Sequence, residues 1–164
     1  CCLSYKQRGK DTHKSLLTKL LSILFQKVQE QGFYILLSAI VVVALTDQFS
    51  AGFMKPYFER LRPCHEPSIT QYIRGLIDCG GQYGFISSHA TNHFGLAVIF
   101  SWFFKKSFDF NYSAWVFYTW AGLISFAQIY VGKHYPGDVI VGAISGIFIG
   151  WVILNRLQKI MKSN

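Results

Sequence analysis

The feature that most constrains this chain is a series of four long apolar stretches. In the 164-residue sequence they cover residues 33–54, 90–104, 112–131 and 137–154. A helix needs ~20 mostly apolar residues to cross a bilayer, and the second stretch reaches that length only with the polar turn before it. Ile35–Leu45 and Val139–Leu154 hold no charged residue, whereas a surface helix of a soluble bundle needs a polar face. Because small residues also recur among the large ones, as in packed membrane helices, the sequence predicts an all-α membrane bundle rather than a soluble one.

The N-terminal part has a different character. Residues 1–14 are polar and are expected to be disordered or interfacial. Residues 15–28 place leucines and isoleucines on one side but are too short and too basic to span. They are either an amphipathic helix lying on the membrane surface or the remnant of a span. We expect one membrane domain over 15–164, with about four full spans plus the N-terminal amphipathic helix. The chain does not begin with Met, which is consistent with one or more N-terminal spans being absent from this domain.

Basic residues are distributed unevenly about the four stretches. If the stretches cross the membrane in turn, eleven of the cations fall on one side: Lys6, Arg8, Lys10, Lys14, Lys19, Lys27, Lys105, Lys106, Arg156, Lys159 and Lys162. The other five are Lys55, Arg60, Arg62, Arg74 and Lys133. The positive-inside rule places the larger group in the cytoplasm. Nucleic-acid binding is not expected from the net charge of +8, because no basic helix face is interleaved with aromatic residues.

Three polar clusters lie on the opposite, non-cytoplasmic side. The first follows the first apolar stretch, where Lys55 and Arg62 are seven residues apart. If this segment is helical, the spacing is two turns, or ~10 Å along one face, and both cations can hold one anion. The alternative is a basic stretch beside the membrane that binds lipid headgroups.

The second cluster is Ser87, Ser88 and His89, where an irregular loop turns into an apolar run. The first N–H groups of a helix lack internal partners and carry partial positive charge, so this turn can bind phosphate. His89 can pass a proton in the same turn. The alternative is an ordinary serine N-cap. His93 lies one turn further, but no carboxylate or cysteine partner is apparent nearby, so no metal is expected and His93 is interpreted as a packed or hydrogen-bonded helix residue.

The third cluster, His134 and Asp138, joins the third and fourth stretches. Pro136 is well placed in a first helical turn, which puts Asp138 where the helix dipole favours its charge. Two cations, a helix N-terminus and a His–Asp pair suit phosphoryl transfer. The phosphate is held by positive groups, one histidine attacks, and another protonates the leaving oxygen.

In these clusters the chain resembles the type 2 phosphatidic acid phosphatase family of integral-membrane lipid phosphatases. The family pattern is Lys-x6-Arg-Pro, then Pro-Ser-Gly-His, then Ser-Arg-x5-His-x3-Asp. The first motif is complete as Lys55, Arg62 and Pro63, the second reads Ile86-Ser87-Ser88-His89, and the third keeps His134 and Asp138. The resemblance covers about residues 45–150.

The resemblance implies a role for each matching residue. His134 is the nucleophile that forms a phosphohistidine, Asp138 holds its ring in the right tautomer, and His89 protonates the leaving group. The phosphate oxygens are bound by Lys55, Arg62, Ser87 and the backbone N–H of Ser88. The family needs no metal, and no other cofactor is expected.

The sequence also departs from the family pattern. Gln128 stands where the family carries its third-motif arginine, so a neutral amide replaces one phosphate-binding cation. Lys133, beside the nucleophile, either supplies the missing charge or points into water. The family usually has six spans, and a missing N-terminal part is the simplest account of the lower number here.

Cys64 and Cys79 both fall in the long loop assigned outside the cytoplasm, where oxidation is possible. We therefore expect a disulfide between them, which would fix Arg62 relative to the Ser87–His89 turn. Two free thiols are the alternative.

Together with these observations, the resemblance implies a metal-independent membrane lipid phosphatase with its site at one membrane face, on the periplasmic or extracellular side of a bacterial inner membrane. Its partners are the bilayer and a phosphorylated lipid; undecaprenyl diphosphate, phosphatidylglycerol phosphate and phosphatidate all fit. The alternative is a catalytically impaired member that binds lipid phosphate or acts as a scaffold. The sequence does not indicate the oligomeric state.

Overall fold

The computed structural model describes residues 18–19, 21–22, 29, 32–73 and 76–163. Within these residues the regular structure is helical and contains no β-strand, so the predicted all-α class is confirmed. The polar segment 1–14 and most of the amphipathic helix expected at 15–28 lie outside the described residues. The chain divides into two compact units, Cys1–Tyr34 and Ile35–Asn164. The described residues of the first unit are helical.

The first long helix runs from Gly32 to Phe58. Its last part consists of a π-helical segment, η1 (Gln48–Met54), and the short α2 (Lys55–Phe58). The helix ends because Glu59 adopts a left-handed conformation with φ of 47°. It stops before Arg62, so the helical alignment of Lys55 with Arg62 that the sequence allowed is wrong.

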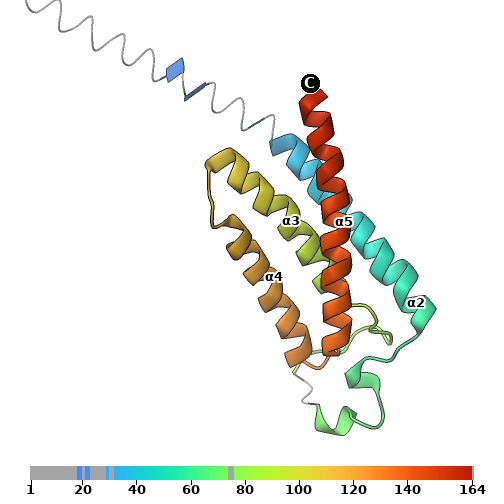
Figure 1. Ribbon diagram of the computed structural model, residues 1–164. Coiled ribbons are helices and arrows are strands. Elements are labelled where there is room, and N and C mark those ends of the chain that lie inside the picture. The colour runs from blue at the N-terminus through green and yellow to red at the C-terminus, as the bar shows by residue number, and fades with distance from the viewer. Residues whose placement is uncertain (1–17, 20, 23–28, 30–31, 74–75, 164) are drawn as a thin grey trace, which may run out of the picture. The chain divides into compact units, whose positions relative to one another are not determined.

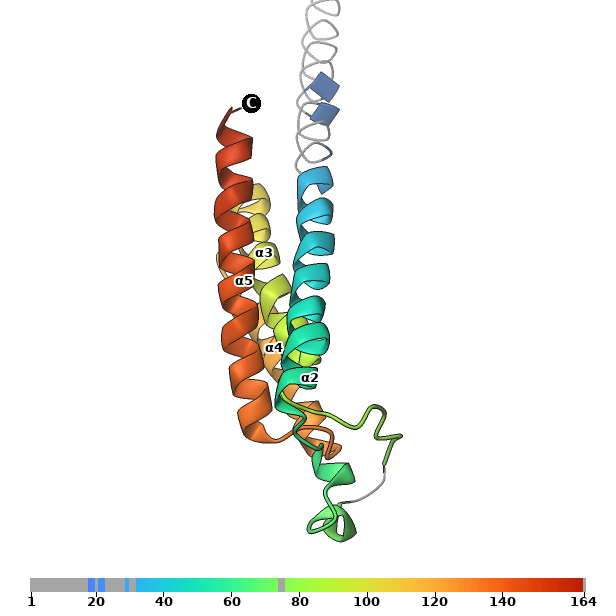
Figure 2. The same cartoon turned by 90° about the vertical axis from the view of Figure 1, so that its right-hand side faces the viewer.

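Three further helices complete the second unit: α3 (Ser88–Phe108), α4 (Ser113–Tyr130) and α5 (Pro136–Ser163). The central helix is α3, which packs against both α4 and α5, while those two contact each other little (Figure 1). The long helix that ends in α2 also reaches α3, where Gly95 lies against Val42 and Thr46 (Figure 2). The connection from Glu59 to Ser87 contains the short helices η2 (Pro63–His65) and η3 (Thr70–Tyr72).

A seam of glycines brings α5 against α3. Gly142, Gly146 and Gly150 recur every fourth residue and so share one face of α5. A Cβ on Gly142 would lie 2.8 Å from the carbonyl oxygen of Ser87, and one on Gly150 would lie 2.7 Å from that of Gly95. Helices approach this closely in membranes where small residues remove the side chains between them. The seam therefore fixes the register of α5 on α3.

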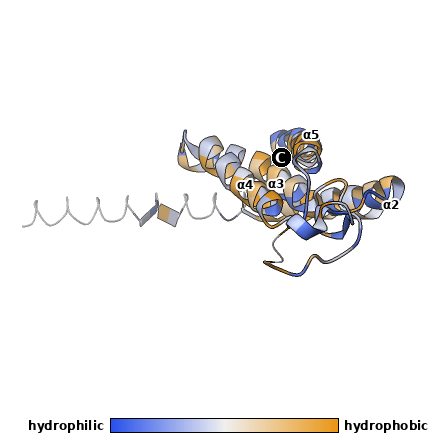
Figure 3. Cartoon of the chain, turned by 90° about the horizontal axis from the view of Figure 1, so that it is seen from below, coloured by the Kyte–Doolittle hydropathy of each residue, from blue (hydrophilic) through white to orange (hydrophobic). Residues whose placement is uncertain are grey.

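Two of the four expected spans are helices long and apolar enough to cross a membrane, Gly32–Phe58 and Pro136–Lys162. In the most apolar 18-residue segment of each helix, only 22% and 33%, respectively, is buried inside the protein, which is low for core helices of a soluble protein. In Figure 3 the ribbon of α5 includes hydrophobic segments, drawn in orange. On α4 the large apolar side chains are also exposed, among them Trp115, Trp120, Leu123 and Phe126. These surfaces suit a lipid environment rather than water.

Candidate active site

The N-terminus of α3 is built by the residues that the sequence singled out. Ser87 is the N-cap, and its side-chain oxygen accepts the N–H of Ala90 at 3.4 Å. The Ser88 hydroxyl meets Lys55 Nζ and the Ser50 hydroxyl, each at 2.8 Å. Ser50 lies in the π-helical segment, and such segments often occur at functional sites. The end of the long helix therefore delivers a cation directly to the first turn of α3.

The turn from α4 to α5 positions His134. The N–H of Lys133 bonds to the carbonyl of Gln128 at 3.1 Å, and that of Gly132 bonds to Ile129 at 3.0 Å. These two bonds form a Schellman motif, which ends a helix with a left-handed residue. Gly132 supplies that residue with φ of 72°. The N–H of His134 also bonds to the Gln128 carbonyl at 3.2 Å, so the end of α4 fixes the backbone of the histidine.

Asp138 closes the first turn of α5. Helix α5 begins at Pro136 with Asp138 in its first turn, as predicted. The carboxylate accepts the N–H of Tyr135 at 2.9 Å through Oδ2, as the acidic residue of a capping box does. The same Oδ2 lies 3.6 Å from Nδ1 of His134, and Oδ1 accepts Arg60 Nη1 at 2.9 Å. Asp138 is fully buried and His134 is 3% exposed.

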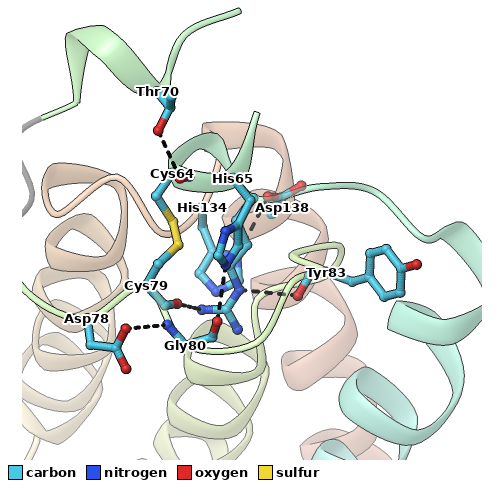
Figure 4. Close-up of a disulfide and its surroundings, with 10 residues drawn as sticks. Cys64, His65, Thr70, Asp78, Cys79, Gly80, Tyr83, His134 and Asp138 are labelled. Carbon is cyan, nitrogen blue, oxygen red and sulfur yellow. Dashed lines mark hydrogen bonds and ion pairs between the residues drawn. A yellow bond between two sulfur atoms is a disulfide. The ribbon is translucent and has the colours of Figure 1, made fainter. Parts of the chain in front are cut away.

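The loop before α3 places Arg62. Its Nη1 donates to the carbonyl of Cys79 at 2.8 Å, and its Nε donates to that of Tyr83 at 3.2 Å. The structure contains a disulfide between Cys64 and Cys79, the pair expected from the sequence, with a Cα–Cα distance of 6.2 Å (Figure 4). Two of the five guanidinium N–H donors of Arg62 are used in this way, and no hydrogen bond joins the others to a described residue, so they can bind an anion.

These segments place the predicted site residues within electrostatic range of one another. His134 interacts with Arg62, Asp138 and Lys55, and His89 interacts with His134, Lys133 and Lys55. Burial lowers the pKa of His134; the neighbouring carboxylate of Asp138 opposes this shift, while Arg62 and Lys55 add to it. The neutral imidazole that results is the form able to act as a nucleophile.

The remaining predicted residues have less direct placements. The Gln128 side chain has a buried Oε1 without a hydrogen-bond partner among the described residues. Half-buried Lys133 acts on His89 electrostatically. His93 is hydrogen-bonded through Nδ1 to the His89 carbonyl at 2.8 Å, which confirms its interpretation as a hydrogen-bonded helix residue. Among the described residues no group of three or more His, Cys, Asp or Glu is arranged to hold a metal.

Two site residues were missed by the sequence reasoning. Arg60 contacts Asp138, and Ser50 contacts Ser88. Arg60 stands two residues before Arg62 in a basic stretch, and Ser50 follows Thr46 at helical spacing in an apolar run. These patterns were visible in the sequence, but neither indicated which partner the side chain would meet.

An apolar groove of ≈ 360 Å³ runs between α3 and α4. Its lining comprises His93, Leu96, Ala97, Phe100, Val116, Phe117 and Trp120. The His93 ring lies parallel to that of His89, with centroids 6.3 Å apart, so the polar end of the groove adjoins the predicted proton donor. A lining of this kind suits a hydrocarbon chain.

Comparison with known proteins adds a family and two relatives. Residues 31–162 match the PAP2 superfamily. A "Lipid A 4'-phosphatase" of Porphyromonas gingivalis is 33% identical over 132 residues, which cover 80% of this chain and 54% of that protein. A "Lipid A 4'-phosphatase" of Bacteroides thetaiotaomicron is 34% identical over 145 residues, which cover 85% of this chain and 63% of that protein. The chain thus spans less than two thirds of the length of either relative. No solved structure matches it.

Proposed function

The chain belongs to the PAP2 superfamily, and from this membership and the geometry of the site we propose that it is a membrane lipid phosphatase. The observation that carries the proposal is the buried His134, whose Nδ1 faces Asp138 while Lys55 and Arg62 act on it electrostatically. A neutral histidine with one nitrogen directed at a carboxylate has its other nitrogen free to attack. The adjacent cations suit the charge of a phosphate group.

In the first step, Nε2 of His134 attacks the phosphorus atom of the substrate. The bond from phosphorus to the leaving oxygen breaks, and His89 donates a proton to that oxygen. The imidazole becomes cationic while its Nδ1–H remains directed at Asp138, whose negative charge stabilises it. The product of this step is a phosphohistidine and the dephosphorylated lipid.

In the second step, water attacks the phosphorus atom of the phosphohistidine. His89, now neutral, takes a proton from the water, and the N–P bond breaks with its electron pair returning to Nε2. Inorganic phosphate leaves, and both histidines return to their starting protonation states. No metal or other cofactor takes part in either step.

Phosphate oxygens are held by groups at the α3 N-terminus and in the loop before it. Lys55 is already directed to this turn through its bond to the Ser88 hydroxyl. Arg62 adds a second charge, while Ser87 and the Ser88 N–H supply hydrogen bonds. Gln128 and Lys133 lie at the ends of the turn that carries His134, and we assign both to the rim of the phosphate site.

The lipid lies partly in the membrane. With 21 and 18 residues, α3 and α4 would reach about 32 and 27 Å at 1.5 Å per residue, so we infer that both cross the bilayer in addition to the two apolar helices. The hydrocarbon chain of the substrate occupies the α3–α4 groove, because that groove begins one helical turn from His89. The site faces away from the cytoplasm, on the side that carries fewer basic residues.

The relatives' names add a substrate to those that the sequence suggested. A lipid A 4′-phosphate is a phosphomonoester on a lipid-linked sugar, and it would be hydrolysed by the same two steps. Phosphatidate, phosphatidylglycerol phosphate and undecaprenyl diphosphate remain the other candidates.

The test is phosphate release by the purified full chain in detergent micelles. The panel contains lipid A bearing a 4′-phosphate, phosphatidate, phosphatidylglycerol phosphate and undecaprenyl diphosphate, each with and without EDTA. We expect release from at least one lipid, undiminished by EDTA and abolished in His134→Ala. Binding of these lipids without any release would instead support the alternative of a lipid-phosphate-binding protein.

A further inference from the structure

Arg60 is held against the candidate active site at three points. Its Nη1 donates to Oδ1 of Asp138 at 2.9 Å, and its guanidinium carbon lies 4.2 Å from the centre of the Tyr135 ring. Its backbone carbonyl accepts the N–H of Gly84 at 2.8 Å. The backbone bond fixes where the side chain starts and the ring contact fixes where it ends. The guanidinium is therefore preorganised on the carboxylate.

The carboxylate that it contacts needs such a partner. Asp138 has 0% of its side chain exposed, whereas that of Arg60 is 44% exposed. A buried carboxylate is costly unless it is paired and hydrogen-bonded. Oδ2 already accepts the N–H of Tyr135, so Arg60 on Oδ1 leaves each oxygen with a donor and fixes the plane of the carboxylate.

We propose that Arg60 is a positioning residue for phosphoryl transfer, one that acts through Asp138. The inference rests on the proposed function. In the structure Nδ1 of His134 is 3.6 Å from Oδ2 and makes no hydrogen bond with any described residue. When Nε2 attacks phosphorus and the ring becomes cationic, Nδ1–H closes on Oδ2, and Arg60 keeps the carboxylate from turning away. No proton moves to Asp138 or Arg60 in this step.

This role differs from that of the phosphate-binding cations. Gln128 stands in place of one family cation, but Arg60 does not replace that cation. Its Nη1 donates to Asp138, whereas Lys55 Nζ donates to Ser88 in the turn assigned to the phosphate. An arginine that binds phosphate contributes to substrate affinity. An arginine that holds Asp138 contributes only once charge develops on His134, so its removal should lower kcat and leave KM unchanged.

The kinetic test compares Arg60→Ala and Arg60→Lys with the unchanged full chain, using phosphatidate and lipid A 4′-phosphate in micelles as probes. We expect Arg60→Ala to lower kcat by about 10- to 100-fold, as removal of an outer hydrogen-bond partner does at metal sites, with KM unchanged. Arg60→Lys keeps the charge but not the planar fork and should recover part of the loss. The control is Arg156→Ala, an exposed arginine near the far end of α5.

Two further measurements separate positioning from general damage. Because Arg60 is partly exposed, added guanidinium ion should restore turnover to Arg60→Ala but not to Asp138→Ala. Thermal unfolding of Arg60→Ala, Asp138→Asn and the double variant tests the pair without any substrate. Removing Arg60 should lower Tm in the presence of Asp138 and should have little effect once Asp138 is Asn.

The outcomes distinguish this inference from the proposed function. If the unchanged chain releases phosphate and Arg60→Ala has the same kcat, the positioning role is wrong while the phosphatase stands. A raised KM with unchanged kcat would place Arg60 on the phosphate and also overturn the inference. If the unchanged chain releases no phosphate from any lipid of the four-lipid panel, both proposals fail, even where the unfolding data show the pair.

Discussion

The fold holds the side chains of His134 and Asp138 in a fixed orientation relative to each other. Their spacing of four residues places them on either side of the helix start at Pro136, so the carboxylate both caps α5 and faces the imidazole. The Schellman turn after α4 sets the histidine backbone independently. The side chain of His134 is therefore oriented by two helix ends, which accounts for its burial without a close hydrogen bond.

The first prediction concerns the two histidines. His134→Ala should abolish phosphate release from every substrate, because no other group replaces the nucleophile. His89→Ala should slow release from lipid phosphates by about 10²- to 10⁴-fold, the usual contribution of general acid catalysis, and should harm p-nitrophenyl phosphate least because its leaving group needs no proton. His65→Ala is the control, since the His65 side chain contacts the Gly80 carbonyl in the exposed loop. Near-normal turnover by His134→Ala would contradict the assignment.

The second prediction concerns Gln128 and Lys133. Oε1 of Gln128 is buried and has no hydrogen-bond partner among the described residues, and a rotation of the amide would present the NH₂ group to a bound phosphate in its place. Gln128→Ala should then lower kcat/KM, and Lys133→Ala should lower it far more than Lys159→Ala, a change at an exposed lysine near the end of α5. A bound tungstate ion offers a direct structural check. A Gln128 side chain turned away from that ion would show that its assignment to the site is wrong.

At the scale of elements, the α3–α5 seam explains why two motifs far apart in sequence meet. Asp138 lies four residues before Gly142, so it belongs to the same face as the three glycines. The seam ends where the N–H of Ser87 bonds to the Asp138 carbonyl at 3.1 Å. Close packing along α5 therefore sets the first turn of α3 beside the start of α5.

The third prediction tests this seam. Gly146→Ala would put a Cβ against the Thr91 carbonyl oxygen and force the helices apart. This change should lower the free energy of unfolding by about 1–3 kcal/mol, which is typical of overpacking. We expect a lower Tm in detergent and reduced turnover. The matched control is Gly122→Ala in α4, where a Cβ would meet nothing within 4 Å and should be neutral or slightly stabilising because alanine favours helix. Equal effects of the two changes would show that the glycine seam does not determine how α5 packs on α3.

The fourth prediction tests the α3–α4 groove as the site of the lipid chain. Val116 lines the groove and is 51% exposed, so Val116→Trp can fill it with little strain on the core. KM for long-chain lipid phosphates should rise, while turnover of water-soluble p-nitrophenyl phosphate should not change. Ala114→Trp, an exposed position outside the groove lining, is the control. If KM stays constant, or if both substrates suffer equally, lipid or another protein segment covers the groove instead.

At the scale of the molecule, the sequence was sufficient for the class of fold and for the order of the three polar clusters. Charge-free apolar runs predict helices, and the expected alternation of four spans predicts that Lys55, His89 and His134 lie on one side. Residue spacing could not reveal that the long helix stops at Glu59, because the left-handed conformation there depends on the loop that follows. It also could not assign Arg60 to Asp138, since these two residues are 78 apart in sequence and the loop that carries Arg60 is paired through Leu61 with Tyr83.

The last prediction joins the topology of the whole chain to its loop chemistry. If the loop after α2 lies outside the cytoplasm, Cys64 and Cys79 should be oxidised to the disulfide in protein from intact cells, whereas Cys1 and Cys2 should remain reduced on the other side. Alkylation of unreduced, denatured protein followed by mass spectrometry distinguishes the two pairs.

Closing this 15-residue separation stabilises the fold by ~3 kcal/mol in the chain-entropy model, so a Cys64→Ser, Cys79→Ser variant should unfold at a lower temperature. Because Arg62 donates to the Cys79 carbonyl, the same variant should raise KM for phosphate-bearing lipids. Alkylation of both loop cysteines without reduction would rule out the bond and, with it, the oxidising side assigned to the active site.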